Sequence, residues 1–186
     1  MCRPHKCWLT ALVLGALAAA QDGGVIVRPT DRSALPEGEI SVLARAAGGR
    51  LELDGAPVSA EAPFPNVLHA KVSPTPGEHT LALVWEGGRR EIRFFAGQHA
   101  PAEYLPFRQH PPTEIACTQC HGVSRRGRFR FTGGCFECHE QEQFAGIHQH
   151  APHVLEQCGM CHNAHGSTAQ AHMTLSREIA CKQCHD

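Results

Sequence analysis

Four short motifs in the C-terminal part of the chain constrain its folding more than any other feature. Each motif is a pair of cysteines three residues apart, followed directly by a histidine. The copies span 117–121, 135–139, 158–162 and 181–185. The first and last copies belong to a longer repeat, because seven of the eight residues in 114–121 recur identically in 178–185. Such repetition indicates one chemical requirement that the chain meets four times.

C-x-x-C-H is the attachment sequence for c-type haem. The two thiols add across the two vinyl groups of one porphyrin, and the histidine that follows is carried under the ring, where it can bind the iron. We therefore expect four covalently attached haems. The attachment residues are Cys117, Cys120, Cys135, Cys138, Cys158, Cys161, Cys181 and Cys184, and the proximal iron ligands are His121, His139, His162 and His185.

Zinc and disulfide bonds are two other uses of paired cysteines. Zinc sites often contain C-x-x-C elements, but zinc does not require a histidine directly after every pair. An exported chain permits disulfides. Four loops of this size would join nothing distant, however, and a disulfide stabilises most when it closes a long loop. Covalent haem is the interpretation that uses every residue of the motif.

The composition of the C-terminal region also favours a cofactor. Of the 77 residues in 110–186, eleven are Leu, Ile, Val or Phe, which is fewer than a polypeptide usually needs for a core of its own. Without a cofactor this region is expected to be disordered. Four haems would supply the missing apolar volume. The sequence thus predicts a haem-packed, mostly irregular and short-helical domain over 101–186.

The first twenty residues have the parts of a secretory signal peptide: a basic start, an apolar stretch over 8–20 and small residues at its end. The apolar stretch is about two-thirds as long as a membrane-spanning helix, so no retained membrane span is expected. Cleavage after Ala20 would remove Cys2 and Cys7 and leave only the motif cysteines. The mature protein is expected to be exported, to the periplasm or to the cell surface and exterior.

Residues 22–100 contain no cysteine and predict a small antiparallel β-sandwich, similar at the level of the fold to immunoglobulin-like modules. Partial alternation of apolar and polar residues predicts strands at 25–29, 40–46, 50–53, 67–72, 79–86 and 91–95. Asp54-Gly55 and Gly87-Gly88 predict hairpin turns. Residues 97–112, which include four prolines, predict a linker.

Residues 110–186 resemble multihaem c-type cytochromes that carry a doubled C-x-x-C-H unit. In that unit the first motif is followed by x-x-His-Gly-Ser, and a second motif follows after a spacer. Here the unit reads "CHNAHGS" over 161–167, and the second motif begins at Cys181. The family often has proline where this chain has Ala164. The resemblance implies closely packed haems, each iron held by two histidines, that transfer electrons.

Four irons with histidine on both faces need four distal histidines. Methionine is not the expected ligand, because Met160 lies inside a motif and Met173 is the only other methionine after residue 1. His165 occupies the family's distal position in "CHNAHGS". Three further histidines precede a motif by seven to nine residues, and three more are held in reserve. The expected distal ligands are His165, His110, His150 and His172, with His148, His99 and His153 as reserves.

Four arginines lie within six residues between the first two motifs, in the segment 124–131. Nucleic acid is not the expected partner, because the chain is not basic: it has 17 Lys and Arg against 18 Asp and Glu. Guanidinium groups pair well with carboxylates, so pairing with the haem propionates is the preferred interpretation. Docking of an acidic redox partner is the alternative.

Electron transfer is therefore the expected function, with redox partner proteins such as other cytochromes, a reductase or an oxidase. The β-sandwich would serve docking, self-association or assembly into a larger complex or filament. The alternative is a multihaem oxidoreductase of the nitrite or hydroxylamine type. Such an enzyme needs one haem with an open iron position, often marked by lysine in place of the motif histidine. All four motifs here end in histidine, so an enzyme is not expected.

Overall fold

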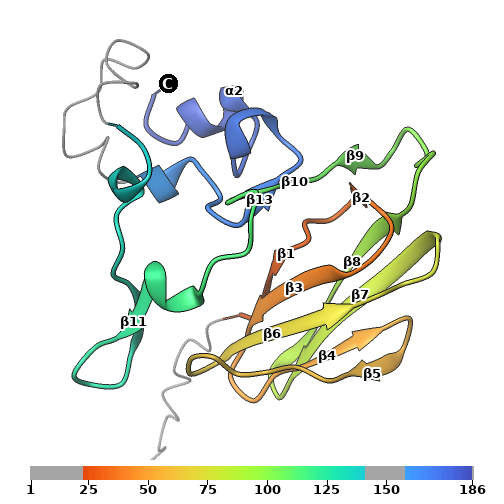
Figure 1. Ribbon diagram of the computed structural model, residues 1–186, viewed down its shortest axis with the longest axis horizontal. Coiled ribbons are helices and arrows are strands. Elements are labelled where there is room, and N and C mark those ends of the chain that lie inside the picture. The colour runs from red at the N-terminus through yellow and green to blue at the C-terminus, as the bar shows by residue number, and fades with distance from the viewer. Residues whose placement is uncertain (1–22, 141–157, 186) are drawn as a thin grey trace, which may run out of the picture.

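The computed structural model describes residues 23–140 and 158–185. The predicted signal peptide and three histidines, His148, His150 and His153, lie outside these ranges. Figure 1 shows β-sheets in the N-terminal part, coloured orange to green, and the C-terminal segments, coloured green to blue, beside them. No helix in the described ranges is long and apolar enough to cross a bilayer.

Two sheets make up the N-terminal part. The smaller sheet has three strands in the order β1-β3-β6, namely β1 (Val25–Arg28), β3 (Ile40–Arg45) and β6 (Val67–Val72). The larger sheet has six strands in the order β5-β4-β7-β8-β2-β9. These are β2 (Ser33–Leu35), β4 (Arg50–Leu53), β5 (Ala56–Val58), β7 (Gly77–Trp85), β8 (Gly88–Ala96) and β9 (Leu105–Pro106).

The hydrophobic core lies between the two sheets and draws side chains from both. Val42 of β3 and Leu81 and Phe94 of the larger sheet are fully buried in it. Strand β8 shows why the sequence alternates, since Ile92 and Phe94 face the core while Arg93 between them is exposed. Burying one face of each sheet in this way stabilises the sandwich through the hydrophobic effect.

The six segments predicted as strands are all strands, and both predicted hairpins are present, but the second turns at Glu86 and Gly87, with Gly88 already in β8. β4 and β5 are joined by Asp54 and Gly55, which both have positive φ, +50° and +80°. A two-residue turn of this kind matches the twist of the strands that it joins, and glycine adopts it without strain. β7 and β8 pair over their whole length up to Trp85 opposite Gly88.

The prediction of a wholly antiparallel sandwich is wrong at one edge. Strand β2 pairs in parallel with β8 on one side and with β9 on the other. Strand β2 was not predicted, because three residues are too few to show an alternating pattern. Strand β9 lies within the segment predicted as a linker, and so does β10 (Arg108–Gln109). The chain that leads from the sandwich to the motifs therefore has defined structure.

The C-terminal part consists of short elements without a core of their own. They are η1 (Cys117–Gln119), β11 (His121–Val123), β12 (Phe129–Phe131), η2 (Cys135–Glu137), η4 (Cys158–Met160), β13 (Gly166–Ser167), η5 (Gln170–His172) and α2 (Arg177–Cys181). After residue 110, Ala180 is the one apolar residue that the described structure buries. Of the large apolar side chains that it leaves exposed, all but Leu105 follow residue 110. The polypeptide alone does not cover these side chains.

Candidate haem centre

All four cysteine pairs fold into the same turn. In each motif the N–H of the second cysteine donates to the carbonyl of the first, over 3.1 to 3.3 Å. Three of the pairs lie in 3-10 turns, and the fourth begins at the last residue of α2. Residues three apart in a helical turn lie on one face. Both thiols of a motif are therefore on the same side of the backbone, as attachment to one porphyrin requires.

The motif histidines continue this turn in three of the four copies. The N–H groups of His139, His162 and His185 donate to the carbonyl of the first cysteine of their own motif, at 3.0, 2.9 and 3.0 Å. His121 instead opens strand β11, where it is paired with Phe131 of β12. Its ring also packs against Phe129, with the ring centroids 4.8 Å apart. The first motif is thus held by a β-hairpin.

The rings of His121 and His165 face each other. Their centroids are 5.8 Å apart and their planes differ by 12°. Burial, together with smaller effects of the nearby His121, Arg28 and His110, lowers the pKa of His165 to about 4. His165 is consequently neutral at physiological pH, and the neutral imidazole is the form that binds a metal.

A second pair of histidines has the same geometry. The rings of His110 and His139 have centroids 5.9 Å apart and planes that differ by 14°. The Nδ1–H of His110 donates to the carbonyl of Ala164 over 3.1 Å. With Nδ1 used in this way, Nε2 is the nitrogen left to bind a metal. The structure therefore sets a predicted distal histidine opposite a predicted proximal one twice.

The ring separations in both pairs are those expected for two imidazoles that share one iron. Two rings that share one metal through nitrogens about 2 Å from it have centroids roughly 6 Å apart. The ring separation is the observation that bears on haem iron, which would bind Nε2 of each histidine.

The third motif shows a related arrangement at its proximal residue. The Nδ1–H of His162 donates to the carbonyl of Ala171 over 2.7 Å, so that Nε2 is the nitrogen left for a metal. His172, predicted as a distal ligand, directly follows Ala171. Its ring centroid is 5.1 Å from that of His110. Their planes differ by 60°, unlike those of the two facing pairs. His172 thus joins the cluster without facing one motif histidine.

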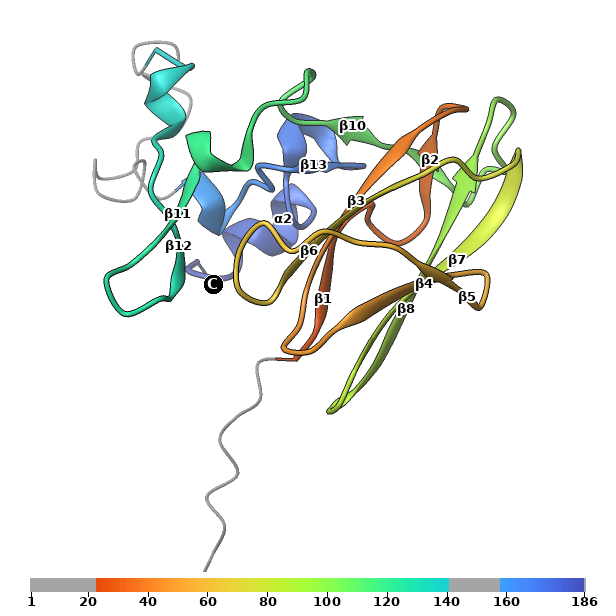
Figure 2. The ribbon, with the colours of Figure 1, turned by 60° about the horizontal axis from the view of Figure 1, so that its bottom comes forward.

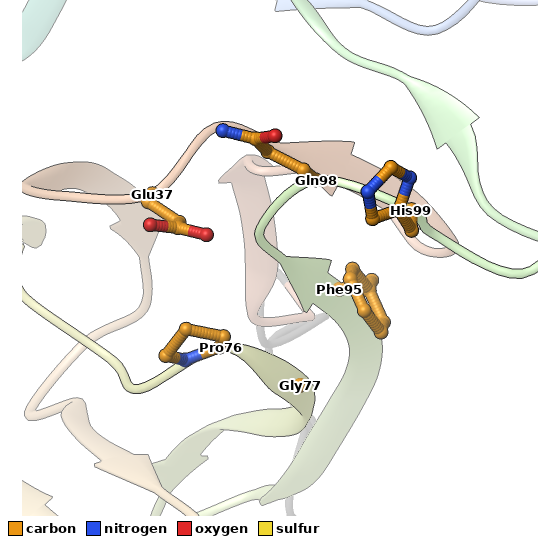
Figure 3. Close-up of a pocket in the computed structure, with 6 residues that line it drawn as sticks. All are labelled: Glu37, Pro76, Gly77, Phe95, Gln98 and His99. Carbon is orange, nitrogen blue, oxygen red and sulfur yellow. The ribbon is translucent and has the colours of Figure 1, made fainter.

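One reserve residue lies elsewhere. His99 lines a groove of about 380 Å³ together with Glu37, Pro76, Gly77, Phe95 and Gln98. Figure 3 shows the His99 ring beside Phe95 and Gln98 on the sandwich. None of the residues that line this groove belongs to a motif. The structure therefore does not bring His99 to a motif histidine. His150, His148 and His153 lie outside the described residues.

The first three motifs lie close to one another. Burial raises the pKa of the Cys135 thiol, and the thiol of Cys158 raises it further. Burial likewise raises the pKa of Cys120, as do Glu137 and Cys138. In the described ranges no disulfide joins any of the eight motif cysteines. Nor do three or more His, Cys, Asp or Glu side chains there form a group suited to a bare metal ion.

The structure shows a role for Gly166, the glycine of "HGS", that was not apparent from the sequence. This glycine has φ of +111°, and a Cβ at this position would press on the carbonyl of Arg108 and on Phe107. Strand β13, which contains Gly166, pairs here with β10. Because His110 directly follows β10 and His165 directly precedes β13, this pairing places both of the histidines that were expected to be distal ligands. Only glycine allows the two strands to approach so closely.

The β-sandwich also contributes to the first motif, which the sequence did not indicate. The ring of Phe64, in the turn before β6, packs on Phe129 with centroids 5.1 Å apart and lies 6.3 Å from His121. Arg28 of β1 donates from Nη2 to Oε1 of Gln109 over 2.6 Å. Lys71 of β6 bonds Glu114 at 3.2 Å. The sandwich is thus a platform against which the first motif is positioned.

Comparisons with known proteins identify no family. No family model matches the chain, and no curated protein does. Among solved structures, it is similar over 44% of its length to an FMN-binding β-glucuronidase from Facaelibacterium prausnitzii L2-6, with 17% identity and a TM-score of 0.36. A polysaccharide lyase matches 41% of the chain with 13% identity and a TM-score of 0.35. The kinase region of twitchin from C. elegans matches 40% with 16% identity and a TM-score of 0.27. The chain spans 12% to 16% of the length of these proteins.

Proposed function

We propose that this protein is an exported tetrahaem c-type cytochrome that relays electrons through closely packed haems, each with histidine on both axial faces. The observation that carries the proposal is the pair of facing imidazoles that occurs twice, His121 with His165 and His139 with His110. In each pair one residue belongs to a C-x-x-C-H motif and the other was expected as a distal ligand from the sequence alone.

The chain's own residues supply what such a centre needs. The cysteine pairs lie on one face of a turn, where they can form two thioethers with one porphyrin. The carbonyls of Ala164 and Ala171 orient the rings of His110 and His162. Bound haem iron supplies one-electron redox chemistry, and two histidine ligands give it a lower potential than a methionine ligand would. Filled axial positions favour transfer of electrons over reaction with a substrate.

Within this proposal the sandwich, of immunoglobulin-like type, serves docking or assembly. Three contacts support a fixed attachment to the haem region: Phe64 against His121, Arg28 with Gln109, and the β10–β13 pairing. A fixed platform keeps the distance from a docked partner to the first iron constant. Electron transfer to and from another protein depends on that distance.

Mass and spectra of the purified, exported protein test the proposal. Four covalent haems would add about 2.5 kDa in total to the mature chain. All four irons should be low-spin and closed to cyanide and nitrite, because imidazole fills both axial positions. A high-spin iron that binds nitrite readily would instead favour a multihaem oxidoreductase. Stoichiometric zinc with no haem would overturn the proposal.

A further inference from the structure

The β11–β12 hairpin presents a concentrated positive charge. Its turn runs from Ser124 to Arg128 and contains Gly127, and it is closed by backbone bonds of 2.8 Å and by the Ser124 hydroxyl, which accepts from the N–H of Arg128 over 3.1 Å. Four exposed arginines follow one another along this turn and strand β12. They are Arg125, Arg126, Arg128 and Arg130. Among the described residues none of them forms an ion pair. Figure 2 shows the hairpin extending from the body of the molecule.

A hollow of about 530 Å³ lies between this hairpin and the sandwich, and we call it the hairpin groove. It is lined by Arg45, Ala46, Ala47, Pro65, Asn66, Trp85, Glu86, Gly87, Gly127, Arg128 and Phe129. Two aromatic rings, Trp85 and Phe129, thus line the same hollow as two guanidinium groups and one carboxylate. Deep aromatic and arginine side chains are the residues that contribute most at protein interfaces.

The aromatic walls of the hairpin groove are held in place. A Cβ on Gly24 would lie 2.6 Å from the Trp85 ring, and a Cβ on Gly88 would lie 3.2 Å from it, so both glycines make room for the indole. Phe129 is fixed between Phe64 and His121, with ring centroids 5.1 and 4.8 Å away. A preformed hollow of this kind loses little entropy when a partner fills it.

The hairpin groove is one aromatic ring away from the first motif, because Phe129 contacts His121 directly. The attraction for an anion is local to this face, since the chain as a whole has a formal net charge of −1. A single cluster of positive charge on a nearly neutral protein steers an acidic surface to that cluster and orients it.

We propose that the β11–β12 hairpin and the hairpin groove together form the docking surface for an acidic redox protein, whose apolar side chain enters between Trp85 and Phe129. This proposal rests on the proposed electron-transfer function and names the place where a partner meets the first haem. Acidic groups of the partner bind Arg125, Arg126 and Arg128, and the groove takes the side chain that they surround.

Binding of a labelled acidic peptide with one central leucine to the haem-loaded protein tests the surface by fluorescence anisotropy. Replacing Arg125, Arg126 and Arg128 by Gln should weaken binding at least about tenfold and flatten its dependence on salt. The matched control removes three exposed arginines elsewhere, in the triple variant R32Q/R90Q/R177Q, and should change binding by less than about twofold. Replacing the leucine of the peptide by alanine should weaken binding several-fold and leaves the protein unaltered.

Three results would overturn the proposal. The first is equal weakening by the control variant, since attraction would then be general. The second is that single-stranded DNA of the same charge and the peptide with alanine both bind as tightly as the peptide with leucine, since the surface would then bind any polyanion. The third is unchanged peptide binding with shifted haem potentials, since the arginines would then serve the propionates. If the purified, exported protein carries no haem and yet binds the peptide through Arg125, Arg126 and Arg128, the proposed function fails and the docking surface stands.

Discussion

The imidazole of His165 lies 5.8 Å from that of His121, ring centroid to ring centroid, and nearly parallel to it. The first residue directly precedes strand β13, and the second opens strand β11. Neither residue reaches the other through local structure. They meet because β13 is paired with β10 and because the β11–β12 hairpin packs on Phe64 of the sandwich.

The first prediction concerns His165→Ala. The variant should open one haem of four, because loss of one imidazole leaves one axial position that water or cyanide can fill. Cyanide titration followed by absorbance and EPR spectroscopy measures this. His99→Ala is the control, since His99 lies in a groove of the sandwich without motif residues. Cyanide binding by the His99 variant would show that His99 ligates an iron, contrary to its assignment here.

The second prediction separates the two facing pairs. His110→Ala should also open one haem, and the double variant H110A/H165A should bind two equivalents of cyanide. The reason is that His110 faces His139 whereas His165 faces His121. If the double variant binds a single equivalent, both histidines serve the same iron and the assignment is wrong.

The third prediction concerns Gly166→Ala. Its Cβ would meet the Arg108 carbonyl, so β13 must move away from β10. We expect a loss of about 1–3 kcal/mol in unfolding free energy and weakened ligation at the two histidines that these strands place. Denaturant titration and the low-spin EPR signals report the two effects.

Gly38→Ala is the matched control for this change. Gly38 has φ of +113°, almost equal to that of Gly166, but a Cβ there would meet nothing within 4 Å. It therefore carries the same backbone strain without the collision. Spectra altered equally in both variants would mean that strain, and not the β10–β13 approach, is responsible.

The fourth prediction is a pH dependence of the sandwich. His79 is buried between two acceptors, with Nδ1 2.7 Å from Oδ2 of Asp54 and Nε2 2.7 Å from the carbonyl of Thr75. Burial alone lowers the pKa of His79, but the bonds to Asp54 and Thr75 outweigh it and raise the pKa above 6.5. Both ring nitrogens must carry hydrogen to donate to both acceptors. The protonated ring is thus part of the fold.

The sign of the effect follows from linkage. A raised folded-state pKa contributes stability that is fully present below 6.5 and is lost as the pH rises through the folded value. The free energy of unfolding, measured by urea titration with far-UV circular dichroism, should therefore fall as the pH is raised from 6 to 9. Asp54→Asn removes the charge opposite His79 and should flatten this slope. An unchanged slope in that variant would assign the dependence to other groups.

The fifth prediction concerns all eight motif cysteines. Replacing them by serine should leave residues after 110 open to proteases while the sandwich persists, because every residue of the hydrophobic core lies between Ile26 and Ala96. Limited proteolysis with mass spectrometry of the fragments measures this. A protease-resistant C-terminal part without haem would show that the polypeptide supplies its own stability there.

Much of the sandwich could be predicted from the sequence. Alternation in segments such as 91–95 identified six strands, and Asp54-Gly55 identified a turn, because these signals arise from residues close together in the chain. Strand β2 and its parallel pairing with β8 and β9 could not be found in this way. A parallel pairing joins segments far apart in sequence, and three residues carry no period.

For the candidate site, the sequence by itself determined which residues have the right chemistry and how each cysteine pair is presented. Spacing within one turn is a local property, and the four motifs fold alike. Which of the histidines expected to be distal ligands lies beside which motif histidine was decided only by the tertiary structure. His110 and His165 flank two strands that pair across the molecule, and Gly166 permits that pairing by lacking a Cβ. Long-range contacts depend on where whole elements pack, and no local pattern of residues records that.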